Sequence, residues 1–210
     1  MIGLFDYDND DDNLQRDRTM TNPSTAVAQA GDVATHPVAP VVDSPERVRV
    51  WDPFVRSFHW SLTIAVLIAF LTGDELEGLH VFAGYVVMGL IAARLVWGVI
   101  GPKHARWWDF VRGPSAIKAY LGDVLRGHPA RYLGHNPAGG AMAVALIAGL
   151  ILTTLTGLAA QSVHGLKGVH ELIAYATLCL VPLHLLGVAV ASFQHKENLV
   201  RGMIDGYKRK

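Results

Sequence analysis

The chain has 210 residues, of which 51% are hydrophobic and only 17% charged, and its formal net charge at pH 7 is zero. The fraction of charged residues is lower than in a typical soluble domain. Cys179 is the only cysteine, which excludes an internal disulfide and any metal site built on paired thiolates.

Residues 1–45 contain eight aspartates and two arginines, few large apolar residues and no periodicity. Such a composition predicts a disordered, acidic N-terminal tail. No basic stretch leads into an apolar run there, so we expect no cleavable signal peptide, and Met20 is an alternative start. We therefore place a boundary after residue 45 and assign residues 46–210 to one membrane domain.

Four apolar segments follow, at about residues 54–73, 79–100, 139–161 and 168–194. A membrane-spanning helix needs about 20 mostly apolar residues, and the last three segments meet this outright. The first does so if Arg56 extends its charge to the membrane interface. The pattern predicts an all-α integral membrane protein, a four-helix bundle.

Basic residues are distributed unevenly around these spans. Fourteen lysines and arginines lie before span one, between spans two and three, or after span four, whereas the other two loops contain only Lys167. The positive-inside rule therefore predicts that both termini are cytoplasmic.

The loop between spans two and three contains a further helical pattern. Gly113-Pro114-Ser115 suits a helix start, and apolar residues then recur at helical spacing (Ile117, Tyr120, Leu121, Val124, Leu125). This predicts a short amphipathic helix at the membrane interface, with an ordinary cytoplasmic loop helix as the alternative.

The spans carry four histidines whose depths match in pairs. His170 and His184 lie fourteen residues apart in the last span, so they face nearly the same side at depths that differ by roughly 21 Å. With both termini inside, His59 has the depth of His184, and His80 has the depth of His170. Imidazoles inside a membrane are costly unless they are partnered.

Each pair offers one imidazole to either side of an iron ion, as a six-coordinate haem b requires. The spacing therefore predicts two haems b per chain, with His59 and His184 binding the iron of an inner haem and His80 and His170 that of an outer haem. The alternatives are interfacial or hydrogen-bonded histidines, or zinc. Zinc is the weaker of these because it prefers four ligands within bonding distance.

Arg94 follows His80 by fourteen residues and therefore lies on nearly the same face of span two, near the inner side. We predict that it binds a propionate of the inner haem, with extension to the cytoplasmic interface as the alternative. The remaining histidines are expected at the surface or in the tail (His36, His104, His128, His135, His164, His195). Of these, His135 in the turn 134–137 is the one considered as lining an inner-face site.

Several motifs together resemble one family. The run VWDPFVRSFHW at residues 50–60 is similar to the opening of the bacterial cytochrome b561 family, which includes the b-type cytochrome subunits of nickel–iron hydrogenases. Further similarities are His80 with Gly84-Tyr85, RLVWG at 94–98, YLGHNP at 132–137, His170-Glu171, His184, and HKENL at 195–199. The resemblance covers about residues 47–208. It implies a four-helix membrane cytochrome with two b haems at His59, His80, His170 and His184.

The hypothesis is a membrane electron carrier that moves electrons between a quinone pool and a redox partner in the bacterial inner membrane. The expected partners are the lipid bilayer, a quinone and a periplasmic c-type cytochrome or dehydrogenase subunit, with a homodimer left open and no nucleic acid. The alternatives are a haem-free transporter that uses its histidines for protons or metal ions, an enzyme acting on quinone or oxygen species at a haem edge, and an assembly or anchor subunit.

Overall fold

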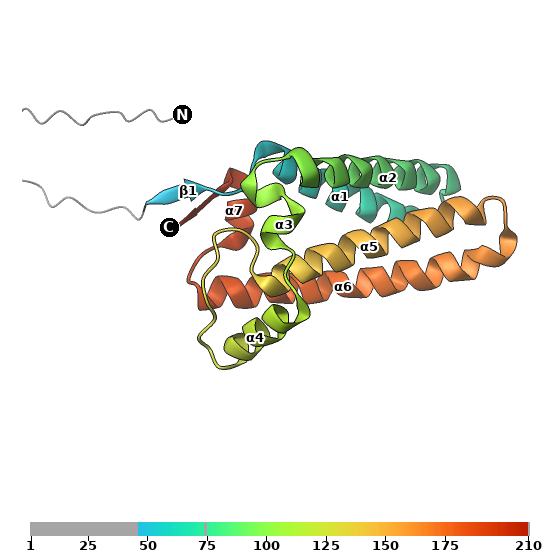
Figure 1. The fold of residues 1–210 in the computed structure, drawn as a ribbon. Helices are drawn as coiled ribbons and strands as arrows, with labels where there is room; N and C mark the ends of the chain where they lie inside the picture. The colour runs from blue at the N-terminus through green and yellow to red at the C-terminus, as the bar shows by residue number, and fades with distance from the viewer. Residues whose placement is uncertain (1–45, 74, 210) are drawn as a thin grey trace, which may run out of the picture. The chain divides into compact units, whose positions relative to one another are not determined.

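The computed structural model describes residues 46–73 and 75–209, so the predicted acidic tail lies outside the described residues. Its elements, in chain order, are β1 (Arg47–Arg49), α1 (Pro53–Thr72), α2 (Glu77–Ile100), the 3-10 turn η1 (Lys103–Ala105), α3 (Trp107–Phe110), α4 (Pro114–Leu125), α5 (Pro137–Ala160), the 3-10 turn η2 (His164–Leu166), α6 (Lys167–Gln194), α7 (Leu199–Asp205) and β2 (Tyr207–Arg209) (Figure 1).

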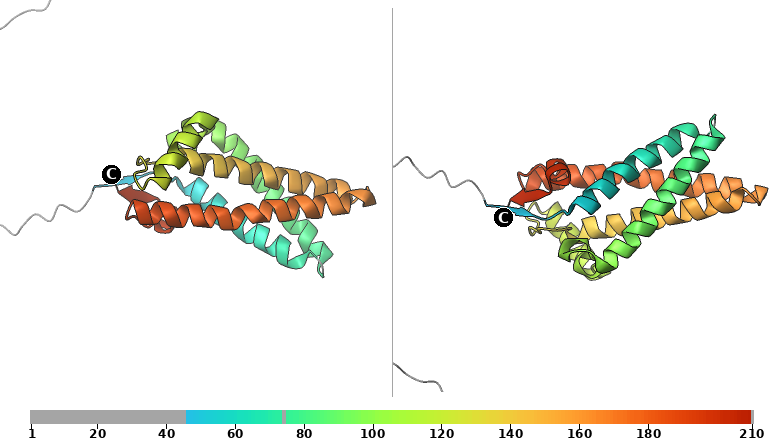
Figure 2. Two further views of the ribbon diagram at one scale, coloured as in Figure 1. Left: turned by 90° about the horizontal axis from the view of Figure 1, so that it is seen from below. Right: turned by 90° about the horizontal axis from the view of Figure 1, so that it is seen from above.

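The helices α1, α2, α5 and α6 are long and apolar enough to cross a membrane, which confirms the predicted all-α fold with four spans. They form two helical hairpins, α1 with α2 and α5 with α6, and α2 packs on α5. Figure 2 shows that the two hairpins cross at an angle. We call the end with the connections α1–α2 and α5–α6 the loop end, and the end with the two short strands the sheet end.

Capping residues set where two of the spans begin. The side chain of Asp52 accepts a hydrogen bond from the backbone N–H of Val55 at 3.1 Å, and Pro53 occupies the first turn of α1. Asn136 and Pro137 do the same for α5, with Gly139 N–H donating to the Asn136 side chain at 2.7 Å. Such caps satisfy N–H groups that have no partner within the helix. Span three therefore begins two residues before its first predicted residue.

The packed centre of the bundle lies between α1, α2 and α5. Ala65, Val87 and Ile91 are buried there, and Ile147 and Ile151 of α5 pack against them. Elsewhere the spans are apolar all round, and many of their large side chains are exposed, as is typical of helices that face lipid (Ile64, Leu67, Leu71, Phe82, Val96, Leu172, Leu183, Leu185).

At the sheet end, β1 and β2 pair antiparallel, with Arg47 opposite Arg209. The guanidinium of Arg47 binds the carboxylate of Asp205 at 2.7 Å. Lys208 is buried in β2, and its Nζ donates to the carbonyl oxygen of Tyr132 at 3.1 Å. The strand pair and α7 have no counterpart among the predicted elements, and they bring the two ends of the described domain together.

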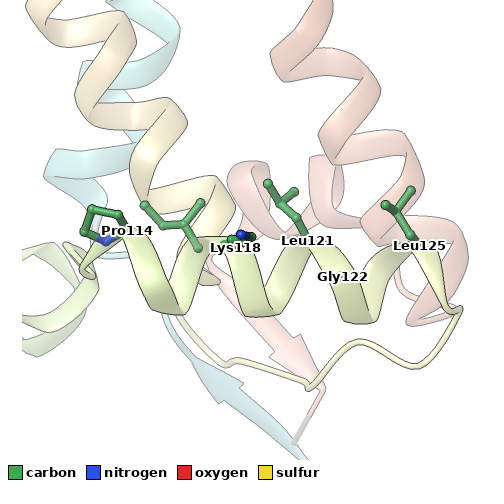
Figure 3. A pocket seen from close by; sticks show the side chains of 6 residues that line it. Pro114, Lys118, Leu121, Gly122 and Leu125 are labelled. Atoms are coloured by element: carbon green, nitrogen blue, oxygen red, sulfur yellow. The ribbon is translucent and has the colours of Figure 1, made fainter.

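Helix α4 lies in the connection between α2 and α5, where the sequence predicts a helix. Pro114, Leu121 and Leu125 project from one side of it, the side on which α5 and α6 rise in Figure 3. The Gln194 side chain at the end of α6 donates to the Val124 carbonyl oxygen at 3.0 Å. This bond ties α4 to α6.

Candidate functional site

His80 and His170 come together at the loop end. Each lies in the first turn of its helix, α2 or α6. Their ring centroids are 5.9 Å apart, and the ring planes are inclined at 81°. The helix starts that follow the two tight connections thus place two imidazoles side by side, at the depth where the sequence predicted a pair.

A backbone carbonyl fixes the orientation of both rings. His80 Nδ1 lies 2.8 Å from the carbonyl oxygen of Ala69, and His170 Nδ1 lies 2.9 Å from that of Thr153. Since a carbonyl oxygen can only accept, Nδ1 carries the proton in each ring. The Nε2 lone pair of each neutral imidazole is therefore free to bind a metal ion.

This arrangement fits an iron ion with two axial imidazoles. Metal-binding histidines usually donate their other ring N–H to a carbonyl or carboxylate, as both rings do here. Two imidazole nitrogens at about 2 Å on opposite sides of one metal ion place the ring centroids roughly 6 Å apart. Gly157 makes room for the pair, because a Cβ at this position would lie 2.9 Å from Cε1 of His170.

The second predicted pair lies toward the sheet end. His59 on α1 and His184 on α6 are both half-buried and close enough for their charges to interact. The Nδ1 of His59 is buried and has no hydrogen-bond partner among residues 46–73 and 75–209. This Nδ1 differs from those of His80 and His170, each of which donates to a backbone carbonyl oxygen.

Arg94 is buried near the sheet end, with 4% of its surface exposed. Its Nη2 donates to the Ala105 carbonyl oxygen at 3.0 Å, and its guanidinium carbon lies 4.6 Å from the Trp107 ring centroid. Its Nη1 is buried and has no partner in the described part of the chain. These contacts hold the guanidinium inside the protein, so it does not extend into water.

His135 is half-buried with a buried Nδ1, whereas the sequence analysis expected it at the surface, with an inner-face site as the alternative. Its ring packs between Trp51 and Phe110, at 4.7 Å from each ring centroid. Burial, and next the charges of Arg94 and Lys208, lowers the pKa of His135 to about 3. The Asn136-Pro137 helix start was the available signal, because it places His135 directly before a capped membrane helix.

The other histidines take ordinary roles. His104 Nδ1 lies 3.2 Å from a carboxylate oxygen of Asp109. His128 and His164 are exposed, His195 is half-buried, and His36 lies outside the described residues. Within the described ranges, no three His, Cys, Asp or Glu side chains gather as metal ligands, whereas two imidazoles meet at the loop end.

Comparison with known proteins identifies the family of the chain. The family model of prokaryotic cytochrome b561 matches residues 50–206. A protein of Rhodobacter capsulatus, named probable Ni/Fe-hydrogenase B-type cytochrome subunit, is 22% identical over 77% of this chain and 81% of its own length. Proteins with the same name from Azotobacter vinelandii and Azotobacter chroococcum are each 26% identical over 56% of this chain, which spans 63% of their length. No solved structure matches the chain.

The family match covers most of the chain, including all four spans and the four paired histidines. Haem b is the cofactor that this family implies, and the outer imidazole pair fits it. The chain belongs to the prokaryotic cytochrome b561 family and is a multi-pass membrane b-type cytochrome of electron transfer.

Proposed function

We propose that the chain carries two haems b and moves electrons between a quinone and a redox partner in the bacterial inner membrane, with both termini in the cytoplasm. His80 and His170 bind the outer iron, His59 and His184 bind the inner iron, and Arg94 binds a propionate of the inner haem. When bound, haem supplies reversible one-electron transfer at its iron.

The outer imidazole pair carries this proposal. The two rings lie 5.9 Å apart, and both Nδ1 atoms donate to helix carbonyls. The backbone of α1 and α5 thus fixes the tautomer and direction of both ligands before any metal arrives. His80 and His170 would together hold the iron, which would supply electron transfer and not a binding position for substrate.

For the inner pair, the support is the proximity of His59 and His184 at the predicted depth, together with the buried Nη1 of Arg94, which has no hydrogen-bond partner among the described residues. The carboxylate of Asp52 is close enough to interact with the charge of Arg94, and a haem propionate would supply a direct partner for Nη1. Two haems at different depths then form a path for electrons through the bundle.

The names of the relatives favour a Ni/Fe hydrogenase as the redox partner. Its docking surface, or that of a periplasmic c-type cytochrome or dehydrogenase subunit, is the loop end around His80, His164 and His170. The quinone binds near the sheet end, in the region 107–131 or the turn 134–137. Helix α4 lies at the membrane interface with its apolar side toward the lipid. A homodimer is compatible with this arrangement.

Haem content and reduced-minus-oxidised spectra of the purified protein test the proposal, together with alanine variants of each of the four histidines. Two haems b per chain are expected in the wild type. His80→Ala and His170→Ala should each lose the same haem, and His59→Ala and His184→Ala the other. His164→Ala is the matched control, because this exposed histidine of the loop end should keep both haems.

Two other results would contradict the proposal in different ways. Protein made with ample haem that still contains none would support the alternative of a haem-free transporter or assembly subunit. Two haems whose losses group differently, for example His59 with His80, would leave electron transfer intact and overturn the ligand assignment.

A further inference from the structure

Two buried nitrogen atoms near the sheet end lack partners, and both side chains contact the ring of Phe110. They are Nη1 of Arg94 and Nδ1 of His135, and neither has a hydrogen-bond partner among the described residues. Phe110 is itself only 2% exposed. The guanidinium carbon lies 5.9 Å and the imidazole centroid 4.7 Å from the centroid of this ring.

The charge around His135 is positive. The groups close enough to lower its pKa by their charge are Arg94, Lys208, His184 and His104. One carboxylate interacts with Arg94 in this region, that of Asp52, which also accepts the N–H of Val55 as the cap of α1. A buried site of this kind is stabilised by an anion that enters from outside the chain.

The helix α5 adds to this preference. His135 directly precedes Asn136, the N-cap of this 24-residue helix. The N-terminus of a helix carries a partial positive charge and favours an anion. His184, the proposed α6 ligand of the inner haem, is near enough to His135 for an electrostatic interaction. His135 is therefore expected beside the proposed inner haem, as is Arg94, the proposed partner of its propionate.

We propose that a carboxylate of the inner haem lies between Nη1 of Arg94 and the imidazole of His135, so that His135 is a second residue that binds this group. This rests on the proposed function, which supplies the inner haem. His135 donates one ring N–H to the carboxylate while Trp51 and Phe110 hold the ring in place. The buried positive charge and the buried carboxylate then compensate each other.

The test is a redox titration of both haems in the intact wild-type protein and in His135→Phe. Phenylalanine keeps an aromatic ring between Trp51 and Phe110 but has no donor. A carboxylate that loses a donor keeps more of its negative charge, which stabilises the oxidised haem. We expect the redox equilibrium of one haem to shift about tenfold toward the oxidised form. For a one-electron couple, this lowers the midpoint potential by about 59 mV. The other haem should be unchanged.

Two variants distinguish whether His135 acts as a hydrogen-bond donor or only through packing. His135→Gln keeps an amide donor and should lower the same potential by less, whereas a purely packing role predicts that phenylalanine is the milder change. His184→Ala identifies which potential belongs to the inner haem. His128→Phe is the matched control, since this exposed histidine of the sheet end should leave both potentials unchanged.

Unchanged potentials in His135→Phe and His135→Gln, in a protein that holds two haems, would overturn the inference alone. A shift confined to the outer haem would do so as well. If His135→Phe does not accumulate, His135→Gln decides: a lowered inner potential supports the carboxylate site, and an unchanged one overturns it. Failure of the proposed function is distinct, because the wild type would then lack the two haems.

Discussion

The substitution Gly157→Ala directly tests the loop-end imidazole pair. Gly157 lies on α5 opposite the ring of His170, and a Cβ there would lie 2.9 Å from Cε1 and 3.1 Å from Nδ1. The ring has little freedom to retreat, because its Nδ1 donates to Thr153 at 2.9 Å on the same helix α5. The added methyl group must therefore displace the imidazole or separate α5 from α6.

The expected size of the effect follows from three contributions. Overpacking a close contact costs about 1–3 kcal/mol. Loss of the bond between His170 and Thr153 adds about 1 kcal/mol. Replacing a helical glycine by alanine stabilises the helix by about 1 kcal/mol, which offsets part of this cost. If only the haem-bound state must hold the ring in its present position, the net penalty of about 1–3 kcal/mol corresponds to a roughly 5- to 150-fold weaker affinity for the proposed outer haem.

The assay is haem content per chain and the reduced-minus-oxidised spectrum of the purified variant, followed during dilution into haem-free detergent. Gly157→Ala should lose one haem faster than the wild type and keep the other. Gly168→Ala is the control, because a Cβ at this glycine of α6 would have nothing within 4 Å. If Gly157→Ala retained both haems as the wild type does, the outer iron would not depend on the present position of His170.

Two further predictions concern the sheet end. Hydrogen bonding from the Tyr207 N–H and then from Arg47 lowers the pKa of Asp205, so its stabilising contribution is present above its ordinary pKa near 3.8 and disappears as the pH falls through the lowered value. Asp205→Asn should therefore lower the free energy of unfolding by less than about 1 kcal/mol at neutral pH. Below about pH 4, the melting temperature of the variant should fall less steeply than that of the wild type. Melting curves with an unaltered pH dependence would contradict this role. If the apolar side of α4 faces the membrane, as proposed, a nitroxide at Leu125→Cys in a Cys179→Ser background should be more accessible to lipid-dissolved oxygen than to an aqueous relaxation agent. The same label at Ala119→Cys, about 120° around the helix, should show the reverse order, and equal accessibility at both positions would place α4 away from the interface.

The four spans could be predicted because a membrane demands about 20 apolar residues for each crossing. Counting apolar residues locates the middle of a helix, whereas capping sets its ends. Span three therefore begins at Pro137, behind the Asn136 cap, and not at residue 139. The pairing of β1 with β2 could not be predicted in this way, because three-residue strands have too little periodicity and their partners lie at opposite ends of the domain.

The depth argument also foresaw which histidines would approach one another at the loop end. His80 and His170 each lie at the start of a span that runs in the same predicted direction, which assigns them the same depth, and the structure brings their rings together. Their role as haem ligands stays a prediction. His135 was placed at the surface because its loop has no apolar pattern; its burial depends on Trp51, before α1, and Phe110 of α3, which only the tertiary fold brings to it.

The two sites also differ in how the protein holds them, and this has a functional consequence. At the loop end, the carbonyls of Ala69 and Thr153 fix both imidazoles, and these carbonyls belong to membrane helices. Near the sheet end, the side chains of Arg94 and His135 are held by aromatic side chains of α3 and the segment before α1. If the two proposed haems are present, changes in those connecting segments would alter the charge around the inner haem without moving a ligand of the outer one. The difference between the two haem potentials would then be adjustable from the sheet end alone.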